Sequence, residues 1–175
     1  MHSIIYCYAR WQDKYDELKK SLPNIEFHQG LYDIEQIAGL YPTVIIYDDL
    51  IKLCEEDESL LNLFTTDSHQ KNISVLLLTQ NLFCKGKNFR TISLNSNYMI
   101  LMNNPRDYLQ INCLARQMYP KNSCFLVEAY QDACYYNGEG YGYLMLDLTQ
   151  KTSNFNRVQT GIFLNDLRII YRPKK

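Results

Sequence analysis

The chain has 175 residues, which fits one domain of ordinary size that can bury a substantial core. Hydrophobic residues make up 46% of it and charged residues 21%, which excludes an intrinsically disordered protein. The formal net charge is -1, so DNA binding would require a local basic patch rather than the field of the whole protein.

The cysteines and histidines indicate the compartment. The six cysteines are scattered and form no Cys-x-x-Cys pair. His2, His28 and His69 each lie far from any partner at metal-ligand spacing, so we expect no zinc site and reduced thiols in an intracellular, reducing compartment. We also expect no signal peptide and no membrane partner, because no apolar stretch approaches the length that spans a bilayer.

Strand-like apolar runs alternate with helical spacings along the chain. Trp11, Tyr15, Leu18 and Leu22 recur at helical spacing, and Pro23 ends that helix. We expect strands over residues 3–8, 25–27, 43–47, 73–78 and 98–102, with further candidates over 143–148 and 167–171. We expect helices over residues 11–22, 34–40, 60–64, 111–118 and 126–133.

The apolar runs show no alternation and are separated by helices. This pattern predicts an α/β fold in which a parallel sheet carries helices on both faces, followed by a C-terminal addition of β-structure. Ligands bind beyond the carboxyl ends of such strands. Three predicted strands end in polar clusters that we expect to lie side by side in one crevice. These clusters are Asp48 and Asp49; Thr79, Gln80 and Asn81; and Asn103, Asn104 and Arg106.

The acidic pair follows the strand over residues 43–47. Asp48 can hold Mg²⁺ through the water shell of the ion, and Asp49 can position or deprotonate an attacking water. The alternative is structural: Asp49 caps a helix that starts at Leu50, and Asp48 is an ordinary acid at a strand end.

The amide and the cations have two interpretations each. Gln80 can contact a γ-phosphate or a lytic water, or it is a turn residue in a polar loop. Arg106, or else Arg90, can reach a phosphate in a neighbouring subunit, or Arg106 forms an ion pair with the next residue. Lys85 and Lys87 can contact DNA phosphates, or they lie in a solvated loop.

Six stretches of the chain together resemble a known family. They are residues 5–12 (IYCYARWQ), 44–50 (VIIYDDL), 74–83 (SVLLLTQNLF), 90–95 (RTISLN), 104–107 (NPRD) and 114–120 (LARQMYP). On these stretches the chain resembles the FtsK/HerA branch of P-loop ATPases, specifically the genome-packaging ATPases of Polinton/Maverick elements and adintovirus-like DNA viruses.

The resemblance implies one truncated P-loop ATPase domain over residues 1–175, with a RecA/ASCE-like sheet. Family members use ATP and Mg²⁺ to move double-stranded DNA into a capsid. It therefore implies a homo-oligomeric ring or a full-length ATPase as partner, in the host nucleus or cytoplasm or in a virion. The implied site consists of Asp48 and Asp49 as the Walker B pair, Gln80 as the sensor, Thr79 and Asn81 beside the nucleotide, and Arg106 or Arg90 acting in trans.

The sequence departs from the family at the phosphate-binding loop. The 175 residues contain no Gly-x-x-x-x-Gly-Lys-Ser/Thr motif, and Gly86-Lys87 is followed by Asn88 where a hydroxyl is required. We therefore expect negligible ATP hydrolysis by this chain alone. The missing strand lies beside the strand ending in Thr79 in the family, so we expect an open apolar edge there, unless the strand over 98–102 covers it.

Three interpretations follow. The chain is a truncated or degenerate copy of a packaging ATPase, or it is a subunit without a P-loop that enters an ATPase ring. The third is a receiver-like domain, with Asp48 as phosphoacceptor and Thr79 as switch hydroxyl. Against the third, the first strand ends in Arg10 rather than an acidic pair, and Asn104 and Pro105 stand where a lysine is expected.

Overall fold

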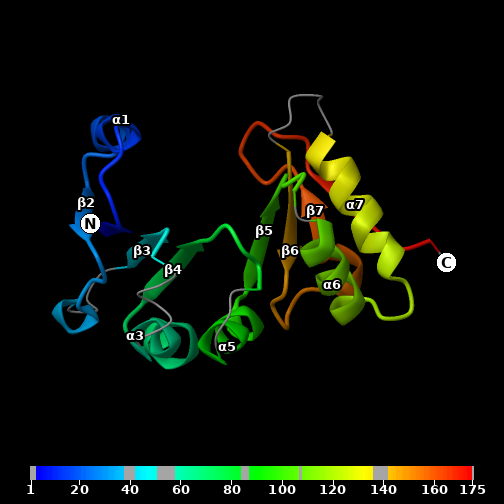
Figure 1. Ribbon diagram of the computed structural model, residues 1–175, viewed down its shortest axis with the longest axis horizontal. Coiled ribbons are helices and arrows are strands. Elements are labelled where there is room, and N and C mark those ends of the chain that lie inside the picture. The colour runs from blue at the N-terminus through cyan, green and yellow to red at the C-terminus, as the bar shows by residue number, and fades with distance from the viewer. Residues whose placement is uncertain are drawn as a thin grey trace. The chain divides into compact units, whose positions relative to one another are not determined.

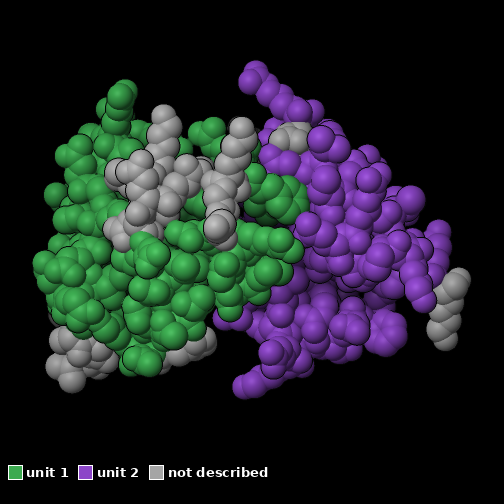
Figure 2. Space-filling view, turned by 60° about the horizontal axis from the view of Figure 1, so that its bottom comes forward, with its two compact units in different colours: residues 1–95 green, residues 96–175 purple. Residues whose placement is uncertain are grey.

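The computed structural model describes residues 3–37, 42–50, 58–83, 87–106, 108–135 and 142–174, without the side chains of His69 and Lys87. The described chain forms two compact units, residues 1–95 and 96–175. Figure 1 labels most of their helices and strands, and Figure 2 colours the two units green and purple. Each unit has its own four-stranded sheet, and each is described separately below.

The first unit contains a parallel sheet with the strand order β2-β1-β3-β4. This confirms the expected α/β fold with a parallel sheet. The strands are β1 (Ser3–Tyr8), β2 (Ile25–Gln29), β3 (Thr43–Asp48) and β4 (Ile73–Leu78). The helical elements are α1 (Lys14–Ser21), η1 (Ile34–Gln36), α3 (Glu58–Asn62), the π-helical turn η2 (Leu63–Asp67), α4 (Ser68–Gln70) and α5 (Lys87–Asn95). The helix expected over 34–40 is a single 3₁₀ turn, and its last residues lie outside the described part.

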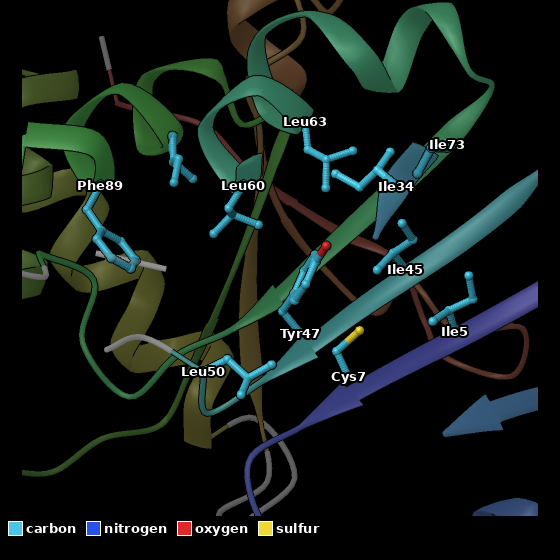
Figure 3. Packing of buried hydrophobic residues seen from close by; sticks show 11 residues of the cluster. Ile5, Cys7, Ile34, Ile45, Tyr47, Leu50, Leu60, Leu63, Ile73 and Phe89 are labelled. Atoms are coloured by element: carbon cyan, nitrogen blue, oxygen red, sulfur yellow. The ribbon is translucent and has the colours of Figure 1, made fainter. Parts of the chain in front are cut away.

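Alternate residues of β1 point to opposite faces of this sheet, and each face has its own apolar cluster. Ile5 and Cys7 enter a large cluster, which α3, η2 and α5 complete from one face (Figure 3). Tyr6 enters a second cluster with Tyr15 of α1 on the other face. Helices therefore pack on both faces, as the unbroken apolar strands predicted.

The strand β4 is an edge strand rather than a fully buried one. It pairs only with β3 among the described strands. Ile73 is buried on the face of the large cluster, whereas Leu76 and Leu78 on the other face are 47% and 39% exposed. The expected open apolar edge is therefore present in this unit.

The second unit contains an antiparallel sheet with the order β5-β6-β7-β8. The strand over residues 98–102 belongs here, paired antiparallel with β6, so its expected place in the parallel sheet was wrong. An apolar run has the same composition in either sheet, and the pairing with β6 joins segments more than forty residues apart. The strands are β5 (Tyr98–Met102), β6 (Tyr143–Asp147), β7 (Val158–Thr160) and β8 (Ile169–Tyr171), with the 3₁₀ turn η3 (Asn154–Asn156) between β6 and β7.

Two helices pack together in the second unit, α6 (Tyr108–Met118) and α7 (Ser123–Tyr135). Leu126, Ala129 and Tyr130 of α7 are buried at the expected helical spacing. The Tyr130 hydroxyl donates to the Met102 carbonyl at 2.9 Å and accepts from the Asn104 amide at 3.0 Å. This side chain therefore fixes the segment that leaves β5. None of the helices in the described ranges is long and apolar enough to cross a membrane.

Candidate functional site

The acidic pair and the Thr-Gln-Asn segment follow two neighbouring strands. In the register of β3 and β4, Asp48 lies opposite Leu78. The two parallel strands therefore end at the same level, and the residues that follow them leave from the same edge of the sheet. The turn that begins at Asp48 and Asp49 and the turn that begins at Thr79 and Gln80 therefore leave the same edge of the sheet.

The Asp48 carboxylate is held by two tyrosines. Its Oδ2 atom accepts a hydrogen bond from the Tyr6 hydroxyl at 2.7 Å and from the Tyr15 hydroxyl at 2.9 Å. The ammonium of Lys14 lies 3.9 Å from the same oxygen, and the Asp48 side chain is only 14% exposed. Asp48 is therefore a partly desolvated carboxylate with a built set of donors, not an ordinary solvated acid.

This arrangement changes the titration of both phenols. Burial, followed by the hydrogen bond to the Asp48 carboxylate, raises the pKa of Tyr15 to about 12. The same two causes raise the pKa of Tyr6 further still. Both hydroxyls therefore stay protonated and act as donors throughout the neutral range.

An aromatic cluster surrounds the two phenols. The Tyr6 and Tyr15 rings lie 5.1 Å apart, and Phe27 packs 5.4 Å from Tyr6. Tyr8 and Trp11 complete the cluster, with ring centroids 5.4 Å apart in an edge-to-face arrangement. The cluster buries the two phenol rings whose hydroxyls bind Asp48.

A small cavity of about 280 Å³ opens at the carboxyl ends of β1 and β3. The chain order reverses between these two strands, because β2 lies on one side of β1 and β3 on the other. In open parallel sheets this reversal marks the usual ligand crevice. The cavity is lined by Ala9, Arg10, Gln12, Tyr15, Asp48 and Asp49.

Asp49 differs from Asp48 in both exposure and backbone. Its side chain is exposed, and its φ of 55° lies in the left-handed region, which non-glycine residues seldom adopt. The turn after β3 therefore directs the two carboxylates differently. Asp48 points to the face of α1, and Asp49 is in contact with solvent at the cavity.

The Thr-Gln-Asn segment forms a side-chain-stabilised turn. The Thr79 hydroxyl accepts from the Asn81 amide at 3.2 Å and donates to the Asn81 carbonyl at 3.0 Å. All three side chains are exposed. Gln80, at the tip of the turn, is therefore accessible to a ligand, which fits the turn interpretation and the sensor interpretation equally.

The predicted cations lie in several parts of the chain. Arg90 is an exposed residue of α5, between the buried Phe89 and Ile92. Arg106 belongs to the second unit, where its amide donates to the Asn104 side chain at 3.1 Å and its own side chain is exposed. Lys85 lies outside the described residues, and so does the side chain of Lys87 at the start of α5.

The donor set at the acidic pair suits a hard cation that keeps most of its water. Within the described ranges, no three His, Cys, Asp or Glu side chains are grouped to hold a metal. Mg²⁺ needs only one or two protein carboxylates when phosphates supply other ligands. Asp48 Oδ1, which takes part in neither tyrosine bond, and the exposed Asp49 carboxylate can fill that role.

Sequence reasoning missed Tyr6, Tyr15 and Lys14 as partners of Asp48. The Tyr6 contact could have been predicted in part from the alternation of side chains along the strands, because Tyr6 and Tyr8 share a face of β1 and Tyr8 lies opposite Asp48 in the register. The contacts from α1 could not have been predicted, since nothing in the sequence places this helix over the end of β3. Compared with known proteins, the chain matches no family model, no curated protein and no solved structure.

Proposed function

We propose that this chain is the part of an FtsK/HerA-type DNA-packaging ATPase that carries the Walker B and sensor strands, and that it does not hydrolyse ATP without a P-loop segment. The observation that carries the proposal is the register of β3 and β4, which ends both strands at one level and puts Asp48, Asp49 and Gln80 at one edge. The family is proposed from the resemblance of the six sequence stretches described above, and the geometry of the sheet is compatible with it.

The open edge of β4 also supports this proposal. The family has a further strand beside the strand that ends in Thr79, followed by the phosphate-binding loop and a helix. Leu76 and Leu78 are exposed at that side of the sheet. A strand and a helix added there would cover apolar surface that is otherwise in water.

The residues of this chain would then act as follows. Mg²⁺ bound to nucleotide phosphates neutralises charge on the transferred phosphoryl group, and Asp48 would hold its water shell. Asp49 would orient the attacking water and accept its proton, and Gln80 would hold that water or the terminal phosphate through its amide. Tyr6 and Tyr15 would hold the Asp48 carboxylate in place, because both donate to Oδ2.

The test is to supply a P-loop segment. A strand–P-loop–helix segment from an intact relative would be fused ahead of residue 1, and Mg²⁺-dependent phosphate release measured with and without it. We expect turnover only in the fusion, lowered by on the order of 100-fold in Gln80→Ala. The matched control is Gln131→Ala, an exposed glutamine of α7. A fusion that binds ATP but turns over equally with Gln80→Ala would contradict the proposal.

A second candidate is a ring subunit that lacks its own P-loop and supplies an arginine to a neighbour. It is favoured by the exposure of Arg90 and Arg106, neither of which forms an ion pair within the described part of the chain. Mixing this chain with an intact family member should raise ATP turnover, and Arg90→Ala or Arg106→Ala should remove the increase. Unchanged turnover together with separate elution of the two proteins would eliminate this candidate.

A third candidate, the receiver-like domain, gains one observation. The strand order β2-β1-β3-β4 is also that of flavodoxin-like doubly wound folds, with Asp48 after β3 and Thr79 after β4. Against it, the lining of the cavity includes Arg10 after β1, where a receiver has acids, and residues 98–102 join the other sheet. Incubation with acetyl phosphate should leave Asp48 unmodified, and a phosphoaspartate at this residue would favour the receiver.

A further inference from the structure

The two sheets have four edge strands, and only two of them are protected against pairing. The edge strand β2 carries the exposed Glu26, and β8 is only three residues long and lies between Arg168 and Arg172. Charge and shortness are the usual means of preventing edge-to-edge association. The edges β4 and β5 have neither, because both are uncharged and expose apolar side chains.

Of the two unprotected edges, β4 is the more open. Met102 at the end of β5 already accepts the Tyr130 hydroxyl with its carbonyl. In the described part of the chain, the residues of β4 form no hydrogen bonds besides those to β3. A strand that adds to β4 would therefore satisfy backbone groups along its whole length.

The side chains of β4 are self-complementary. Ser74, Leu76 and Leu78 lie on the exposed face, and Val75 and Leu77 pack at the margin of the large apolar cluster. An antiparallel pair centred on Leu76 puts Leu76 opposite its own copy and Ser74 opposite Leu78. No charged group is desolvated in this pairing, and apolar side chains meet on both faces.

We propose that β4 pairs antiparallel with β4 of a second copy of this chain, so that the 175-residue chain forms a two-fold dimer with a continuous sheet. The occupant of the edge is a second copy because an identical uncharged strand matches β4 in length, charge and apolar pattern. Two-fold pairing also closes the assembly, since each copy uses the same edge. This inference does not rest on the ATPase proposal. It concerns the 175-residue chain alone, and a P-loop strand fused to the chain and paired with β4 would displace the second copy.

The first experiment is sedimentation of the full chain over a range of concentrations. We expect a monomer–dimer equilibrium in the native chain. Leu76→Lys places two like charges opposite each other in the interface and should raise the dimer Kd by at least about tenfold. The matched control is Ile100→Lys on β5, because Leu76 and Ile100 are both 47% exposed. It should leave the Kd within about twofold, since it adds the same charge to an edge strand of the other sheet, which takes no part in the β4 pairing.

A second experiment retains the apolar character of the interface. Leu76→Cys should give a disulfide-linked dimer under mild oxidation, because directly opposed residues of antiparallel strands have Cβ atoms about 4.5–5.5 Å apart. The native chain controls for its own cysteines, and Ile100→Cys controls for random collision. The proposal fails if the native chain is monomeric at all concentrations, if Leu76→Lys dimerises normally, or if only the residue 100 variants alter or trap the dimer.

Discussion

Removing both hydroxyls that bind Asp48 should destabilise the first unit by more than the sum of the two single changes. Each hydroxyl bonds a carboxylate oxygen at 2.7 or 2.9 Å, and such a bond to a charged group contributes about 1.5–3 kcal/mol. Tyr6→Phe or Tyr15→Phe alone leaves the other donor in place. We therefore expect each single change to lower the free energy of unfolding by about 1.5 kcal/mol.

In the Tyr6→Phe, Tyr15→Phe double variant the Asp48 carboxylate loses both hydroxyl donors. Asp48 is 14% exposed and, among the described residues, would keep only Lys14 as a partner, at 3.9 Å. An under-compensated charge adds its desolvation cost to the two lost bonds, so we expect a total loss of about 4–5 kcal/mol. Adding Asp48→Asn to the double variant should then recover about 1–2 kcal/mol, because a neutral amide is cheaper to keep out of water than a bare carboxylate.

Urea denaturation at neutral pH measures these differences. The single tryptophan, Trp11, lies 5.2 Å from Phe27 in the same cluster, so its fluorescence reports the first unit. Tyr98→Phe, at a tyrosine 56% exposed on β5, is the control and should change stability by less than about 0.5 kcal/mol. Additivity of the two single changes to within about 0.5 kcal/mol, or further destabilisation by Asp48→Asn, would refute the reasoning.

Three further outcomes are expected. The raised pKa of Tyr6 and of Tyr15, the latter to about 12, means that the folded chain keeps phenolic protons that the unfolded chain loses near pH 10. The free energy of unfolding should therefore not change with the titration of these groups below pH 10, and it should fall between pH 10 and 12. Urea midpoints measured across this range check the expectation. Tyr15→Phe should make the fall of stability with pH less steep. Gly161→Ala should cost about 3 kcal/mol, because φ is +70° and the added Cβ would overlap the Leu167 carbonyl oxygen. Gly30→Ala should cost only about 1 kcal/mol, because φ is +89° but no described atom beyond its chain neighbours lies within 4 Å of the added Cβ. Equal thermal shifts for the two variants would contradict the steric argument. Leu63→Ala should cost about 2–5 kcal/mol in calorimetry because this side chain is fully buried, and a loss below about 1 kcal/mol would show that the cluster closes around the cavity.

The local pattern of the sequence predicted most elements of the first unit. Apolar runs located β1, β3 and β4, and the spacing that includes Tyr15 located α1. The sequence pattern did not predict which strands pair, because pairing depends on contacts between distant segments. The run at 98–102 is as apolar as β4, and only its pairing with β6 shows that it belongs to an antiparallel sheet.

The candidate site shows the same division between local and distant information. That Asp48 and Asp49 end a buried strand next to the strand before Thr79 follows from the order of elements, and the register agrees with it. The donors to Asp48 come from β1 and from α1, at sequence distances of 42 and 33 residues. A polar partner supplied by a packed helix depends on the angle of that helix, which spacing alone does not determine.

The hydroxyl of Tyr130 has a mechanical consequence for the segment that carries Arg106. By bonding the Met102 carbonyl and the Asn104 amide, it ties the end of β5 to a helix whose inward face is buried. The Asn104 side chain in turn holds the Arg106 amide. The backbone under this arginine is therefore anchored to α7, so a force applied to the guanidinium would be transmitted to the helix rather than absorbed by a yielding loop.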